Sequence, residues 1–165
     1  MKTSYTRSML IVHGEGGHQA QMRRLLSRFS ELRRDGITVI AVQESGAQVM
    51  DVASVTEQLQ PLRAKTRRTA LFISLMNFCY AVFTSYHLMH KHNVGFVLST
   101  GPGIAIPIAV AARLRGVNIS HIETWSRFYS SSWTAKFLYV LATDFYVQNK
   151  ELLSVFPKAT WSGRL

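Results

Sequence analysis

The stretch "MLIVHGEGGHQAQMRRLL", residues 9–26, decides the fold of this chain. Its apolar start predicts a buried strand from Met9, and three glycines within residues 14–17 break that strand. A pattern of helical period begins directly after His18 and predicts a helix from Gln19 to Arg34 that ends near Gly36. The apolar residues that would share one face of this helix are Met22, Leu25, Leu26, Phe29 and Leu32.

The next segment completes a βαβ unit. The β-branched run "ITVIAV" at residues 37–42 predicts a second buried strand, and a strand, helix and strand in succession indicate a parallel sheet. The alternation continues with strands expected at 94–100, 117–123 and 144–149 and helices at 104–115 and 132–141; residues 43–68 are expected to hold a short helix and a further strand or edge segment. We therefore expect an α/β fold with one doubly wound, Rossmann-like domain over residues 1–165, a length that suits a single core.

The amino-acid composition indicates what kind of partner and which cellular compartment to expect. Charged residues make up 17% of the chain, where soluble domains average about 25%. Nineteen Lys and Arg against nine Asp and Glu give a net charge of +10, which points to an anionic partner: nucleic acid, anionic lipid or a phosphorylated ligand. Cys79 is the single cysteine, which favours a reducing compartment. Nothing before Met9 has the apolar length of a signal peptide, so secretion is not expected.

Basic residues gather at two places along the chain. The first group is Arg23, Arg24, Arg28, Arg33 and Arg34, which a solvated helix face would explain without any function. The second group is Arg63, Lys65, Arg67 and Arg68, directly before the most apolar part of the chain. The second group is the more informative one, because of the segment that follows it.

Residues 69–89 contain no formally charged side chain over 21 positions, nearly the length that spans a bilayer. A spanning helix would place the later strands on the other side of the membrane from the first strand, so one parallel sheet could not form. A helix that covers the core, and a helix that lies at the membrane surface over about 69–91, remain open. Polar interruptions and the flanking basic residues favour the membrane surface. The predicted membrane contacts are Arg63, Lys65, Arg67, Arg68, Leu71, Phe72, Leu75, Phe78 and Phe83.

Three unusual strings follow predicted strands. They are Gly14-Glu15-Gly16-Gly17-His18, Thr100-Gly101-Pro102-Gly103 and Glu123-Thr124-Trp125-Ser126-Arg127. The carboxyl ends of parallel strands meet at one edge of the sheet, where the following helices point their N-terminal N–H groups. The sequence therefore predicts a ligand site at this edge.

The first string differs from known nucleotide motifs. Gln19 stands where the dinucleotide fingerprint has its third glycine, Glu44 is a weak candidate for a ribose ligand, and the Gly-Lys-Ser/Thr of a P-loop is missing. What remains is a bare turn that a pyrophosphate or a sugar can approach. His18 either caps this turn or acts as a general base, for which its ordinary pKa near 6.5 is suitable.

The other two strings leave similar alternatives. Thr100 is a candidate hydroxyl donor beside Pro102, which fixes one dihedral angle, although a generic strand-to-helix turn explains the string equally well. Glu123 and Arg127 are four residues apart and could pair with each other, or Arg127 could bind phosphate through its two-pronged guanidinium.

At these residues the chain resembles the asparagine-linked glycosylation protein fourteen family. That family contains the membrane-associated subunit of a bipartite UDP-N-acetylglucosamine transferase, and bacterial relatives in capsule and exopolysaccharide synthesis. The matching strings are "GEGGHQAQM" (14–22), "LSTGPGIAIPIA" (98–109), "HIETWSR" (121–127), "TAKFLYVLATDFYVQ" (134–148) and "FPKATWSGRL" (156–165). The likeness covers nearly the whole chain in the same order.

The resemblance implies a GT-B glycosyltransferase divided between two polypeptides. This chain would be the N-terminal, acceptor-side half, similar to the corresponding half of the peptidoglycan lipid II synthase. A separate subunit would bind the UDP-sugar donor, and the enzyme would be active only as the heterodimer. The acceptor in the family is a saccharide linked to polyprenyl pyrophosphate, and no metal or other cofactor is expected.

With this interpretation we assign a role to each candidate residue. His18 is the first choice and Glu123 the second choice for the base in an inverting transfer. The acceptor cleft would be formed by Gly14, Glu15, Gly16, Gly17, Thr100, Gly101, Pro102, Gly103, Ser126 and Arg127. The chain departs from the family at Glu15, usually a small hydroxyl residue, at Asn93-Val94-Gly95, usually Pro-Asp, and at Asn149, usually an aromatic residue.

The expected location and the competing functions follow from the same reasoning. Eukaryotic members of the family carry an N-terminal membrane helix that this sequence lacks, so we expect a peripheral protein on the cytoplasmic face of a bacterial inner membrane. A non-catalytic anchor that only activates its partner is the alternative. A nucleic-acid partner is disfavoured, because neither helix-turn-helix spacing nor an aromatic-rich sheet signature is present.

Overall fold

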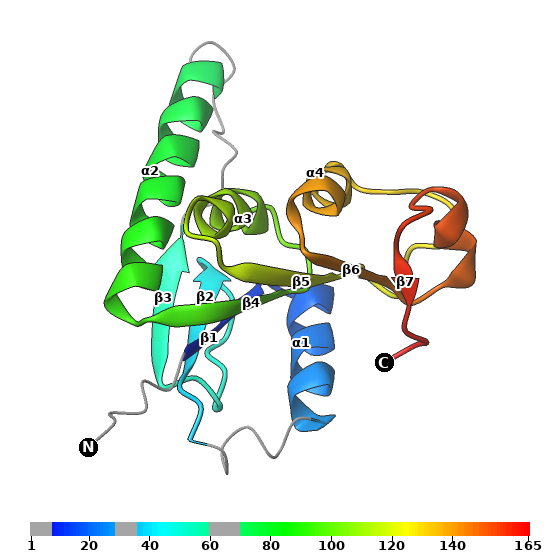
Figure 1. Ribbon diagram of the computed structural model, residues 1–165, viewed down its shortest axis with the longest axis horizontal. Helices are drawn as coiled ribbons and strands as arrows, with labels where there is room; N and C mark the ends of the chain where they lie inside the picture. Colours follow the sequence, from blue (N-terminus) through cyan, green and yellow to red (C-terminus); the bar gives the residue numbers. More distant parts are fainter. Residues whose placement is uncertain (1–7, 29–35, 60–69) are drawn as a thin grey trace.

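The computed structural model describes residues 8–28, 36–59 and 70–165, and the side chains of the helix that begins at Ala70 from residue 74 onward. Seven strands in this part of the chain form one parallel sheet in the order β3-β2-β1-β4-β5-β6-β7 (Figure 1). Their bounds are β1 Ser8–His13, β2 Val39–Glu44, β3 Val55–Leu59, β4 Val94–Ser99, β5 Asn118–Ile122, β6 Asp144–Val147 and β7 Thr160–Trp161. The α/β class with a doubly wound parallel sheet is confirmed.

The strand order reverses between β1 and β4. The chain leaves β1 toward β2 and β3, and then returns to the other side of β1 for β4 and the later strands. The register pairs Ile11 with Leu98 and Val12 with Ser99, so β1 and β4 end side by side. In sheets of this kind ligands bind where the strand order reverses, at the carboxyl ends.

Helices cover both faces of the sheet. Helix α1 (Gly17–Arg28) packs Met22, Leu25 and Leu26 on one face. Helices α2 (Ala70–Lys91), α3 (Ala105–Leu114) and α4 (Trp133–Leu141) cover the other face (Figure 1), where the larger core cluster lies. All six residues of β1 are buried, as expected for a central strand that is covered on both faces.

Some element boundaries differ from the expectations. The second strand begins at Val39 rather than 37, because its pairing with β1 begins at Met9. Helix α1 begins at Gly17 and is described as far as Arg28; its expected continuation to 34 lies outside the described residues. Within 43–68, β3 provides the expected strand, residues 45–54 form turns and irregular structure, and 60–68 are not described. Strand β7 and the short 3₁₀ helix η2 (Lys150–Ser154) were not expected.

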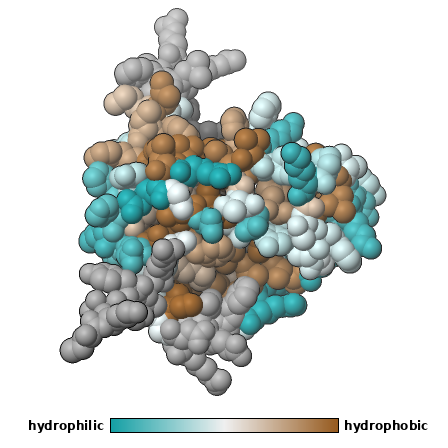
Figure 2. All heavy atoms as spheres, in the orientation of Figure 1, coloured by the Kyte–Doolittle hydropathy of each residue, from teal (hydrophilic) through white to brown (hydrophobic). Residues whose placement is uncertain are grey.

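Helix α2 buries a stripe of residues at intervals of four, Ala81, Ser85 and Met89, and it packs against α3. Figure 2 shows hydrophobic side chains at the surface over α2 and α3. Among the described residues, no helix combines the length and the apolar character needed to cross a membrane.

Candidate functional site

The loops that follow β1 and β4 are joined by two hydrogen bonds. The Nδ1 of His18 donates to the Thr100 carbonyl oxygen over 2.6 Å, and the Thr100 hydroxyl donates to the His18 carbonyl oxygen over 3.0 Å. Thr100 is fully buried, whereas the His18 side chain is half-buried at the edge of the sheet. Because Nδ1 donates, Nε2 carries the lone pair and is the ring nitrogen able to accept a proton.

Gly101 brings the His18 ring close to a second histidine. The backbone of Gly101 has a φ of +95°, and a Cβ atom there would lie 3.0 Å from Cε1 of His121 and 3.6 Å from Cε1 of His18. The Gly101 N–H donates to the Ser99 hydroxyl over 3.2 Å. Both the backbone angle and the two rings therefore require glycine at this position.

His121 belongs to a buried chain of polar groups that leads toward the surface. Its ring is fully buried, and Nε2 donates to Oε2 of Glu123 over 3.3 Å. The other carboxylate oxygen, Oε1, lies 3.9 Å from Nε of Arg127, whose side chain is 38% exposed. The pairing of Glu123 with Arg127, one of the two alternatives from the sequence, is thus observed. It still leaves part of the guanidinium accessible to a ligand.

Side chains at the end of β6 and in α1 fix the segment that carries Glu123 and Arg127. Gln148 and Gln21 both donate to the Glu123 carbonyl oxygen, over 2.9 and 3.3 Å. Asn149 donates to the carbonyl oxygens of Trp125 and Arg127. The amide at position 149 therefore holds this loop against the sheet.

A second carboxylate lies beside the first glycine loop. The Glu44 Oε2 is 2.9 Å from where a Cβ of Gly14 would stand, and Oε1 is 3.9 Å from that of Gly103. Burial raises the pKa of Glu44 above its ordinary value, the nearby His18 acts against this, and the charge of Glu15 adds to the increase. Glu15 and Glu44 thus make this part of the edge acidic, which suits the hydroxyl groups of a sugar better than a phosphate.

The structure brings the predicted site residues to one edge of the sheet. Gly14 lies against Pro102, whose Cβ would be 3.0 Å from a Cβ at position 14. Glu15, Gly16 and Gly17 are exposed at this edge, and a Cβ at Gly16 or Gly17 would meet open space. Ser126 is exposed in the third loop, where its hydroxyl is 3.1 Å from that of Thr124. The described residues contain no cluster of three or more His, Cys, Asp or Glu side chains suited to hold a metal ion.

The predicted membrane contacts are described only in part. Arg63, Lys65, Arg67 and Arg68, and the side chains of Leu71 and Phe72, lie outside the described residues. Leu75 and Phe83 are 60% and 63% exposed, and Phe78 is half-buried.

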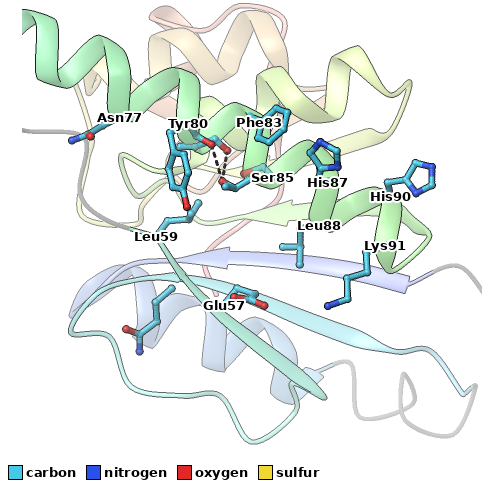
Figure 3. Close-up of a pocket in the computed structure, with 13 residues that line it drawn as sticks. Glu57, Leu59, Asn77, Tyr80, Phe83, Ser85, His87, Leu88, His90 and Lys91 are labelled. Carbon is cyan, nitrogen blue, oxygen red and sulfur yellow. Dashed lines mark hydrogen bonds between the residues drawn. The ribbon is translucent and has the colours of Figure 1, made fainter.

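A large groove lies away from these loops, between β3 and α2. Its volume is about 850 Å³, and its lining includes Glu57, Leu59, Tyr80 and Lys91. Figure 3 shows Tyr80 and Lys91 reaching from α2 toward β3, where Leu59 and Glu57 lie. None of the glycine-loop residues lines this groove, so the groove is separate from the candidate site.

Two residues of the site were missed or misjudged from the sequence. His121 lies two positions before Glu123, and residues at that spacing on a strand point to the same face, so the pattern held a usable signal. Glu44 was considered only as a ribose ligand, whereas it lies beside Gly14. Its proximity arises from the pairing of β2 with β1, which no local motif reveals.

Solved structures with a similar backbone define the class of fold. MurG from Acinetobacter baumannii matches with a TM-score of 0.67 and 19% sequence identity, covering 86% of this chain and 41% of MurG. A UDP-N-acetylglucosamine 2-epimerase (described as putative) from Listeria monocytogenes matches with a TM-score of 0.66 and 11% identity, covering 91% of this chain and 41% of the epimerase. The chain therefore has the fold of one half of a GT-B glycosyltransferase and spans about two fifths of the length of these proteins.

The sequence comparison identifies the family. The family model described as "Oligosaccharide biosynthesis protein Alg14 like" matches residues 9–165, and the chain belongs to this family. The rat protein named UDP-N-acetylglucosamine transferase subunit ALG14 is 30% identical, covering 95% of this chain and 82% of that relative. The human and Candida albicans proteins of the same name are 28% and 26% identical, covering 96% and 94% of this chain and 82% and 76% of those relatives.

Proposed function

We propose that this chain is the acceptor-binding, membrane-associating subunit of an inverting UDP-sugar glycosyltransferase, and that a second polypeptide binds the nucleotide sugar. The name of the relatives supports a transferase subunit with UDP-N-acetylglucosamine as donor. The word subunit in the names of these relatives supports a two-polypeptide arrangement, and the fold of this chain is similar to one half of MurG. A nucleotide-sugar-binding subunit would complete the cleft at the carboxyl edge of the sheet.

The observation that carries this proposal is the pair of hydrogen bonds between His18 and Thr100. The short bond from Nδ1 to the Thr100 carbonyl fixes both the ring and its tautomer, with Nε2 available at the edge of the sheet. In the proposed reaction the acceptor hydroxyl oxygen attacks the anomeric carbon and the bond from that carbon to UDP breaks. UDP leaves with the electron pair, and Nε2 of His18 takes the hydroxyl proton.

The surrounding groups suit the two ends of the acceptor. Glu15 and Glu44 can accept hydrogen bonds from sugar hydroxyls next to Gly14, and the accessible part of Arg127 can bind phosphate. Glu123 is buried with one oxygen on His121 and the other toward Arg127, which favours a positioning role over that of a base. We propose a saccharide linked to polyprenyl pyrophosphate as the acceptor, on the strength of the family resemblance.

The proposed location is the cytoplasmic face of a membrane. The exposed Leu75 and Phe83 of α2, together with the basic residues at 63–68 and the net charge of +10, support contact with an anionic leaflet. A bacterial inner membrane and a role in capsule or exopolysaccharide synthesis remain part of the proposal; the relatives reported above are eukaryotic.

The test is a UDP-release assay on membrane extracts after co-expression with the nucleotide-sugar-binding subunit. His18→Asn keeps an N–H donor near the position of Nδ1 but removes Nε2. The hydrogen bond to the Thr100 carbonyl oxygen is therefore preserved while the proposed base is lost. We expect transfer to fall by about 100-fold or more. Co-purification of the partner subunit should remain unchanged, which would show that the variant is folded.

The anchor alternative gives a different result in the same assay. If the partner subunit performs all of the chemistry, the double variant His18→Asn/Glu123→Gln will retain turnover. That outcome would assign the base to the partner and leave this chain as its membrane anchor and activator.

A further inference from the structure

Helix α4 carries an apolar stripe that the core does not use. Trp133, Phe137 and Val140 are 77%, 52% and 75% exposed, while Ala135 and Leu138 on the opposite side are buried. The exposed residues are spaced at intervals of four and three, which places them on one face of the helix.

The loop before α4 exposes two more aromatic side chains. Tyr129 is 79% exposed and Phe128 is 42% exposed. We call the surface formed by Phe128, Tyr129, Trp133, Phe137 and Val140 the α4 surface. A concentration of large exposed apolar side chains within thirteen residues of the chain indicates an interaction site.

The charged side chains of the segment that carries the α4 surface are all positive. Residues 124–143 contain no Asp or Glu. Lys136 places its ammonium 5.2 Å from the centre of the Trp133 ring. Arg113 donates from Nε to the Leu141 carbonyl oxygen over 2.7 Å, which brings a guanidinium to the C-terminal end of α4. Cations therefore border the apolar stripe at two places.

This composition identifies the kind of partner. Trp and Tyr combine an apolar ring with a polar group and concentrate at the boundary between lipid tails and headgroups. Lys and Arg side chains at that depth reach the anionic headgroups. The rim of a protein–protein interface is polar, whereas residues 124–143 combine large apolar side chains with cations alone.

The position of α4 fits the same partner. Helix α3 contacts both α2 and α4, and all three helices cover the same face of the sheet (Figure 1). Helix α2 exposes Leu75 and Phe83. The surfaces of α2 and α4 therefore belong to one helical layer, on either side of α3.

We propose that the α4 surface is a second membrane-contacting surface, which together with α2 seats the helical layer of this protein on an anionic leaflet. This inference rests on the membrane contact proposed above for α2. The loop from Glu123 to Ser132 joins the candidate site to α4, so contact at α4 holds the Arg127 loop near the headgroups. An acceptor whose pyrophosphate lies at the membrane surface then reaches Arg127 without leaving the lipid.

Tryptophan fluorescence provides a direct test, because the chain has three tryptophans and one lies on the α4 surface. The variant Trp125→Phe/Trp161→Phe retains only Trp133, and Trp125→Phe/Trp133→Phe retains only Trp161. Trp161 is a matched control, because it is 46% exposed and has the Lys150 ammonium 4.2 Å from its ring centre, but it lies on the edge strand β7. With vesicles of phosphatidylglycerol and brominated phosphatidylcholine, at a lipid concentration that sediments both variants completely, we expect quenching of Trp133 and none of Trp161.

A sedimentation assay with unbrominated vesicles separates this inference from the proposed role of α2. Phe137→Ser/Val140→Ser should weaken vesicle binding by about tenfold, and Leu75→Ser/Phe83→Ser should weaken it independently. Val49→Ser, at a residue that is 57% exposed in the β2–β3 connection, should have no effect.

Three results would overturn the inference. Unquenched Trp133, with binding lost only in the α2 variant, would leave the membrane contact of α2 standing without α4. Loss of partner co-purification in the α4 variant, with vesicle binding intact, would assign the surface to the partner subunit. Failure of the unmodified chain to bind anionic vesicles would refute the membrane contact of both helices.

Discussion

The geometry of the proposed site depends on a single glycine between two histidine rings. Gly101 separates His18, which comes from the start of α1, from His121, which comes from the end of β5. A glycine allows the backbone to adopt a positive φ, and the missing side chain leaves room for both rings. The position of the proposed base is therefore set by the β4–α3 loop as much as by the loop that contains His18.

Gly101→Ala should be costly for stability and for turnover. The added Cβ would stand 3.0 Å from the His121 ring at a φ of +95°, so we expect a loss of about 2 kcal/mol or more in the free energy of unfolding. Displacement of the His18 ring should lower UDP release in parallel. Urea unfolding of the chain and the co-expression assay measure the two effects.

Gly103→Ala is the stability control from the same loop, since a Cβ there meets only a carboxylate oxygen at 3.9 Å. We expect a change of less than about 1 kcal/mol in the free energy of unfolding. Equal losses in the two variants would show that the loop tolerates neither substitution for a reason other than the His121 ring.

The sequence predicted part of this residue-scale picture. Residues 14–18 are predicted to lie at the carboxyl edge of the sheet, because a glycine turn directly after an apolar run can be recognised in a short stretch of sequence. The contact between Gly101 and His121 was not foreseen, because it joins loops from neighbouring strands whose register emerges only in the folded sheet. The Thr100 carbonyl as a partner of His18 was hidden for the same reason, since backbone acceptors leave no mark in a sequence.

At the scale of elements, the strength of a pattern decided what could be predicted. The long apolar run at 69–89 predicted α2 almost to the residue, and the β-branched run before the Gln43-Glu44 pair predicted β2 with an offset of two residues. Strand β7 has two residues, too few to show any period, and it forms because it pairs with β6. Whether the exposed face of α2 meets lipid stays a prediction.

Ser132→Ala tests the start of α4, a helix of only nine residues. The Ser132 hydroxyl accepts a hydrogen bond of 2.9 Å from the Ala135 N–H, which would otherwise lack an acceptor within the first turn. We expect the free energy of unfolding to fall by about 1 kcal/mol, measured by urea denaturation. Ser131→Ala, one position before the cap, is the matched control. An equal loss in the control would show that the serine run acts through something other than capping.

We also expect the Ser132 cap to affect the proposed contact of α4 with lipid. Because Trp133 is the first residue of α4, fraying of this turn would misplace the aromatic ring at the N-terminal end of the α4 surface. Loss of vesicle binding in Ser132→Ala beyond the loss in Ser131→Ala would connect the order of the helix to lipid contact.

At the scale of the whole molecule, the proposed membrane contact combines the overall charge with the arrangement of the helices. The net charge of +10 is a property of the composition, and the sequence indicated an anionic partner from it alone. The arrangement of α2, α3 and α4 as one layer needed the structure, because the helices are separated along the chain by strands of the sheet. Their grouping on one side, with exposed aromatic residues on α2 and α4, would orient the proposed contact with an anionic leaflet.

Binding to an anionic leaflet would combine electrostatic attraction with the burial of apolar side chains. Changing the salt concentration distinguishes these two contributions. The Debye length falls from about 10 Å at 0.1 M salt to about 3 Å at 1 M, so attraction between exposed cations and headgroups is largely screened at the higher concentration. Apolar burial of Trp133, Phe137 and Leu75 does not depend on that screening. We therefore expect binding to phosphatidylglycerol vesicles to drop by about tenfold or more over this range, down to the weaker and salt-insensitive affinity for vesicles of phosphatidylcholine alone. Affinity for anionic vesicles that stays constant with salt would mean that the excess of Lys and Arg serves a partner other than the leaflet.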